Sequence, residues 1–167
     1  MDKLLLIVLV VALGQSPDTE LKLTEVVISS LPAECAAEYH PLGREKQKTD
    51  TTEVAHFDFD GDNVSEMVVG TGDFGSGGYD YCVMIRKQGK YRKAGHIFGA
   101  TLHILDDPAY RGLIVGTPCG WDESVWRFWE LKNGTLHCQL ELQIRYAPPK
   151  KGELRTTPTE IKIREIL

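Results

Sequence analysis

The chain has 167 residues, of which 42% are hydrophobic and 26% charged, and this composition suits one folded domain and excludes a disordered chain. Its formal net charge is −5 and its basic residues are scattered. Because phosphate binding requires clustered Lys and Arg, a general nucleic-acid binder is also excluded.

The N-terminus carries an apolar run, LLLIVLVVAL at residues 4–13, directly after Lys3. Ten residues are too few to cross a hydrocarbon core of ~30 Å, which requires about 20 helical residues. The run suits the hydrophobic region of a secretory signal, and Ala12 and Gly14 supply small residues near a cleavage point. We expect a signal peptide over residues 1–14, a secreted or periplasmic protein, and no stable membrane span after cleavage. The alternative is a buried N-terminal strand or helix.

The four cysteines show neither a C-x-x-C spacing nor a zinc-type cluster with His in the sequence. An even count in an exported chain permits two disulfides in three possible pairings, and four buried free thiols are the alternative. The residues concerned are Cys35, Cys82, Cys119 and Cys138.

Residues 15–53 are predicted to form an N-terminal segment with a short helix and a loop. Residues 19–31 fit either a short helix or a strand, and residues 33–40 favour one or two helical turns that Pro41 and Gly43 stop. Residues 44–53 are polar and charged and are predicted to form a loop.

From residue 54 onward the sequence is typical of β-strands. Short runs rich in β-branched and aromatic residues are separated by turns that carry Gly, Asp or Asn, and Asn133-Gly134 is a strong hairpin signal. After a linker from residue 148, residues 159–167 alternate well enough for a last strand. The predicted class is all-β with antiparallel sheets and a minor N-terminal helix.

An internal repeat divides this β region. Residues 69–71 (VGT) recur at 115–117, and residues 87–89 (KQG) match 132–134 (KNG). We expect two repeats of about 46 residues, 54–99 and 100–147, a length typical of a propeller blade. Two blades cannot close a ring, so they should pack as two sheets in one domain, with an oligomer as a further option. The alternative is chance similarity between two β-meanders.

One acidic loop carries the clearest chemistry. Asp58, Asp60, Asp62 and Glu66 stand at positions 1, 3, 5 and 9, and the carbonyl of Val64 falls at position 7. Calcium takes six to eight oxygen ligands, which alternate carboxylates and one backbone carbonyl can supply, and a divalent cation relieves the repulsion among four carboxylates. The spacing predicts that this loop binds one calcium ion and that it is not an EF-hand. The alternative is an acidic hairpin turn that binds nothing.

Residues 57–63 (FDFDGDN) followed by 66–70 (EMVVG) resemble the FG-GAP (VCBS-type) repeat of integrin α-subunit propellers and many bacterial secreted proteins. The resemblance covers about 13 residues and implies the same ligands, with Glu66 in place of the usual Asp and Asn63 in place of the usual Gly. The second repeat reads LDDP at 105–108 and has lost the ligand set, which implies a single ion.

Aromatic residues gather around the corresponding loops of the two repeats and could bind a protein or carbohydrate partner. Buried aromatics of the core are the alternative. On a strand, Trp126 and Trp129 point to opposite faces. The candidate partner-binding residues are Tyr79, Tyr81, Trp121, Trp126 and Trp129.

The sequence therefore favours a secreted or periplasmic calcium-binding β-module. Its expected role is structural, or is to bind a protein or a glycan, and no active site is recognisable in the sequence. The alternative is a secreted hydrolase, or an inhibitor of one, that acts through loops 72–81 and 118–129.

Overall fold

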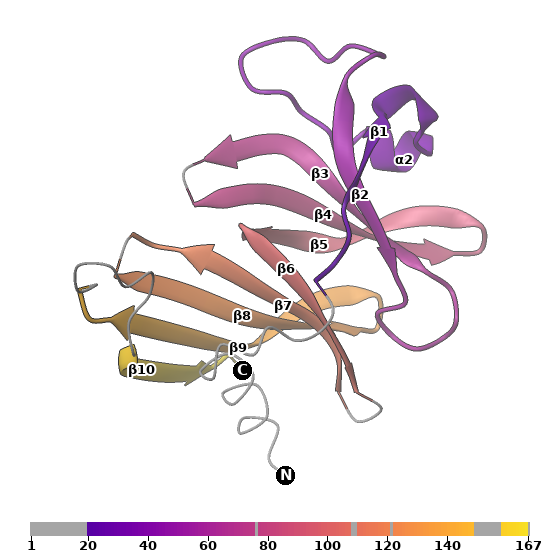
Figure 1. The fold of residues 1–167 in the computed structure, drawn as a ribbon. Coiled ribbons are helices and arrows are strands. Elements are labelled where there is room, and N and C mark those ends of the chain that lie inside the picture. The colour runs from indigo at the N-terminus through magenta and orange to yellow at the C-terminus, as the bar shows by residue number, and fades with distance from the viewer. Residues whose placement is uncertain (1–19, 76, 108–109, 121, 149–157, 167) are drawn as a thin grey trace.

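The computed structural model describes residues 20–75, 77–107, 110–120, 122–148 and 158–166, and in this part of the chain it shows two antiparallel five-stranded sheets (Figure 1). The strand order is β1-β2-β3-β4-β5 in the first sheet and β10-β9-β8-β7-β6 in the second. Each sheet is therefore an up-and-down meander of strands that follow one another in the chain. The predicted signal peptide, residues 1–14, lies outside the described residues.

The strands confirm the predicted all-β antiparallel class. The first sheet contains β1 (Thr24–Val27), β2 (Thr51–Phe57), β3 (Glu66–Gly75), β4 (Gly78–Lys87) and β5 (Lys90–Gly99). The second contains β6 (Thr101–Asp107), β7 (Tyr110–Pro118), β8 (Glu123–Lys132), β9 (Thr135–Tyr146) and β10 (Pro158–Glu165). The described helices are a 3₁₀ turn (Ile28–Ser30) and α2 (Ala33–Ala36), and neither is long or apolar enough to span a membrane.

The N-terminal segment contains more strand than the sequence predicted. The end of the expected loop, residues 51–53, forms the start of β2, which pairs with β1. Thr52 is 7% exposed, and its hydroxyl donates a hydrogen bond of 2.7 Å to the carbonyl of Gly70 in β3. The loop prediction was wrong here because the strand depends on a partner far upstream, which local composition does not show.

The two sheets repeat the same local geometry. Two-residue turns join β4 to β5 and β8 to β9, and both central residues of each turn have positive φ. This is the type I′ geometry predicted from Asn133-Gly134, and Gln88-Gly89 adopts it at the matching point of the first sheet. A register shift also falls between Val83 and Met84 in β4, and again between Phe128 and Trp129 in β8.

One apolar layer joins the sheets, because side chains from both sheets contact one another within a single buried cluster. Gly99, at the end of β5, permits close approach of β7, since a Cβ there would collide with Val115. The buried members of this shared layer are Leu21, Ala55, Phe59, Val68, Tyr81, Val83, Ile85, Ala94, Ile97, Leu102, Leu113, Val115 and Leu136.

The other face of the first sheet is covered by the N-terminal segment. Cys35 of α2 is fully buried against a second cluster, to which β4 contributes Cys82 and Met84. Strand β4 is thus buried on both faces, which explains its continuous apolar run YCVMI at residues 81–85.

The shared layer makes Leu113 a sensitive position. It is 0% exposed, so Leu113→Ala should lower the free energy of unfolding by roughly 2–5 kcal/mol through lost burial and a cavity. Leu42→Ala, at a leucine that is 62% exposed, is the matched control and should change it by less than about 0.5 kcal/mol. Urea denaturation measures both, and equal effects would contradict a core shared by the two sheets.

Candidate metal centre

The acidic loop connects β2 to β3 and is closed at its base by strand pairing. Phe57 pairs with Glu66 across the two strands. Phe59, inside the loop, is 1% exposed and packs into the shared layer, with its ring centroid 5.2 Å from that of Phe57 in an edge-to-face arrangement. Residues 58–65 are therefore held at the boundary of the core, with Asp60 and Asp62 exposed.

The loop follows a tight path that needs left-handed backbone conformations. Gly61 has φ 80° and Asn63 has φ 64°, in agreement with the backbone freedom expected of these residue types. Asp58 accepts hydrogen bonds from both backbone amides, at 2.7 Å from Gly61 and 3.1 Å from Asn63. The Asp58 carboxylate thus shapes the loop as well as facing the centre of it.

Three of the four predicted acidic ligands converge. One oxygen each of Asp58, Asp60 and Glu66 lies within 4.8 Å of the other two, so these carboxylates could hold a metal ion together. Asp62 is not in this group, and its Oδ1 accepts a hydrogen bond of 2.7 Å from the amide of Val64. Val64 itself is 36% exposed on the loop.

Glu66 is the unusual member because its carboxylate is buried. The residue is 2% exposed, and burial raises its pKa to about 7, with the charges of Asp60, Asp62 and Asp58 adding to the increase. The amide of Phe59, 2.6 Å from Oε2, favours the ionised form but is outweighed. Burial and the neighbouring aspartates also raise the pKa of Asp60. The site therefore favours protons or a metal cation.

A residue of the opposite sheet offsets part of the negative charge of the loop. Nη1 of Arg111, in β7, lies 3.3 Å from Oδ2 of Asp58. A Cβ on Gly61 would lie 2.8 Å from the same Nη1, so the glycine also leaves room for this guanidinium. Sequence reasoning missed Arg111, which lies 53 positions from Asp58 and carries no local signal of the contact.

The predicted aromatic surface does not form one patch. Tyr81 is 2% exposed in the shared layer, whereas Tyr79 is 49% exposed. Trp129 packs against the shared layer, and Trp126 packs against a separate cluster on the other face of the second sheet. Trp121 lies outside the described residues.

The two disulfides that the even count permits are not formed in this structure, because all four cysteines are free thiols. Cys35 and Cys82 are buried, Cys138 is half-buried and Cys119 is exposed. Cys35, Cys82 and Cys138 lie on α2, β4 and β9, and Cys119 lies in the connection between β7 and β8.

Comparison of the chain with protein-family models, with curated proteins and with solved structures found no match.

The raised pKa of Glu66 makes metal-free stability depend on pH. The folded protein holds the Glu66 proton more tightly than the unfolded chain does. In chelator, the resulting stability is complete below about pH 4.5 and is lost as the pH rises through about 7, by on the order of 3 kcal/mol. Thermal melts across this range should show the loss.

Glu66→Gln tests the assignment because the amide does not titrate. It should abolish this part of the pH dependence, whereas Glu45→Gln, at an exposed glutamate, should leave it intact. A fall in stability that persists in Glu66→Gln would show that another group is responsible.

Proposed function

We propose that this chain is an exported calcium-binding β-module, in which one Ca²⁺ stabilises the β2–β3 loop and the module binds a protein or glycan. This proposal rests on the convergence of Asp58, Asp60 and Glu66, whose carboxylate oxygens lie within 4.8 Å of one another, with Glu66 buried. Asp62 and the carbonyl of Val64 complete the ligand set in the FG-GAP-type arrangement that this loop resembles.

The donor chemistry favours calcium among divalent ions. Every candidate ligand is an oxygen, which suits hard cations and disfavours zinc or copper. Magnesium prefers a rigid octahedron with several waters, whereas a loop that offers several carboxylates and a carbonyl suits the larger, more flexible calcium sphere. The ion would neutralise the charge that raises the pKa of Glu66.

The repeated geometry of the sheets supports a blade-like reading of each repeat. Strands β2–β5 and β6–β9 each form four consecutive antiparallel strands, with hairpin turns and register shifts at matching points. A four-stranded meander is the unit of a propeller blade. In this proposal the two repeats are two blade-like units that pack face to face, and only the first retains the calcium loop.

Export is proposed from the apolar run at residues 4–13. N-terminal sequencing of protein recovered from the medium or periplasm should give a mature chain that begins near residue 15. An exported chain that retains Met1 would contradict signal cleavage.

Calcium binding can be measured by calorimetry on chelator-stripped protein. We expect one site with a Kd of roughly 10⁻⁵ to 10⁻³ M, as in extracellular modules. At a Kd of about 10⁻⁴ M, 5 mM calcium should then stabilise the fold by about 2 kcal/mol. Asp60→Asn should remove the binding heat and the stabilisation.

Asp122→Asn is the matched control for that variant, because Asp122 belongs to the connection between β7 and β8 and is not part of the loop. It should bind calcium as the parent chain does. An absence of heat from the parent protein at millimolar calcium would refute the proposed function.

A further inference from the structure

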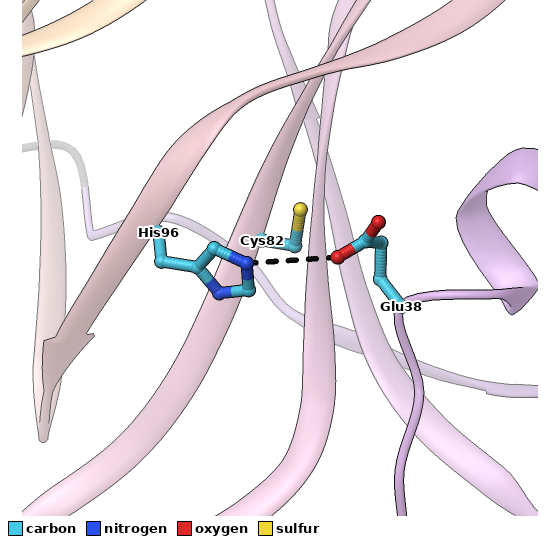
Figure 2. A group of neighbouring side chains, drawn as sticks. All are labelled: Glu38, Cys82 and His96. Carbon is cyan, nitrogen blue, oxygen red and sulfur yellow. Dashed lines mark ion pairs between the residues drawn. The ribbon is translucent and has the colours of Figure 1, made fainter.

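A second group of potential ligands lies on the other face of the first sheet (Figure 2). Glu38 follows α2, and Cys82 in β4 pairs directly with His96 in β5. One ligand atom from each of the three lies within 4.8 Å of the others. Figure 2 shows the imidazole of His96 and the carboxylate of Glu38 pointing toward each other, 3.5 Å apart from Nε2 to Oε2.

The imidazole of His96 is oriented by a second carboxylate. Its Nδ1 lies 3.4 Å from Oδ2 of Asp80, and the same oxygen accepts a hydrogen bond of 3.2 Å from the hydroxyl of Thr71. This contact at Nδ1 holds the ring with Nε2 directed toward Glu38. Histidines that bind metals are typically held in this way.

The thiol of Cys82 is placed as a ligand and not as a nucleophile. The residue is 0% exposed, and burial, followed by the charge of Glu38, raises its pKa to about 12. The sulfur lies 3.4 Å from Sδ of Met84. Such a thiol stays neutral at pH 7, and a metal ion that binds it removes its proton.

We propose that Cys82, His96 and Glu38 bind one Zn²⁺ ion, through the thiolate, through Nε2 and through a carboxylate oxygen, with water as the fourth ligand. Zinc accepts sulfur, nitrogen and oxygen in a tetrahedron, and ligand atoms at about 2.0–2.1 Å from it lie roughly 3.3 Å apart. The observed 3.5 Å between Nε2 and Oε2 matches that spacing. Binding releases the thiol proton to solvent, together with the Nε2 proton when His96 is charged.

The ammonium group of Lys93 would compete with a metal ion for the carboxylate of Glu38. Its Nζ lies 3.0 Å from Oε2 of Glu38. Burial opposes ionisation of Glu38, yet the hydrogen bond and charge of Lys93, with contributions from His96 and Cys82, lower the pKa of this carboxyl. The Lys93 side chain is 48% exposed and can turn into solvent when zinc arrives. Through Glu38, zinc would then bind the N-terminal segment to β4 and β5.

Cobalt(II) is the spectroscopic probe for this site. The full chain, reduced, chelator-stripped and saturated with calcium, should bind one Co²⁺ with a thiolate charge-transfer band and the visible bands of a tetrahedral ion, and Zn²⁺ should displace it. Cys82→Ser should remove the charge-transfer band. His96→Gln and Glu38→Gln, at partly exposed positions, should each weaken binding at least roughly tenfold.

Two further variants separate zinc binding from ordinary ion pairing. Lys93→Met should tighten Zn²⁺ binding, because it removes the competing cation from Glu38. Asp80→Asn, at the positioning residue, should weaken it by roughly 10- to 100-fold. Cys119→Ser and His137→Gln, at exposed residues outside the cluster, are controls that should bind as the parent chain does.

A parent chain without a thiolate-to-cobalt band would overturn the proposal, as would a band that persists in Cys82→Ser. If Cys82→Ser does not fold, unchanged binding in His96→Gln and Glu38→Gln refutes the site. Asp60→Asn removes only the proposed calcium ligand and should retain the cobalt spectrum, so the failure of either metal site is distinguishable from that of the other.

Discussion

The apolar layer between the two sheets is the constraint on which the rest of the structure depends. Phe59, a residue of the acidic loop, is buried in this layer, and its burial fixes the path of the loop. The layer also brings Arg111 of β7 to within 3.3 Å of the Asp58 carboxylate, a contact that joins the loop to the opposite sheet. The geometry of the candidate calcium site is therefore a property of both sheets, although its proposed ligands all come from one short segment.

The loop combines this fixed geometry with an excess of negative charge. Three carboxylates lie close together, and the one on β3, Glu66, is almost completely buried. An uncompensated buried carboxylate is costly, and backbone amides and one guanidinium offset only part of the charge. A divalent cation held by these carboxylates would resolve the conflict, whereas a proton resolves it only below neutral pH.

The sequence predicted the features that depend on neighbouring residues. The strand runs, the turn at Asn133-Gly134 and the spacing that brings Asp58, Asp60 and Glu66 together are all local patterns. It could not predict features that depend on long-range register, namely the pairing of residues 51–53 with β1, the reach of Arg111 to Asp58, and the group that joins Cys82 to His96 and Glu38. The state of the cysteines stayed open for the same reason, since a cysteine count carries no information on the distances between thiols.

A crystal structure of the chain grown in millimolar calcium would reveal whether an ion occupies the β2–β3 loop. We expect an anomalous-scattering peak among Asp58, Asp60 and Glu66, with oxygen ligands at about 2.3–2.6 Å. A well-ordered loop with no peak, and with these carboxylates turned toward solvent, would contradict this expectation.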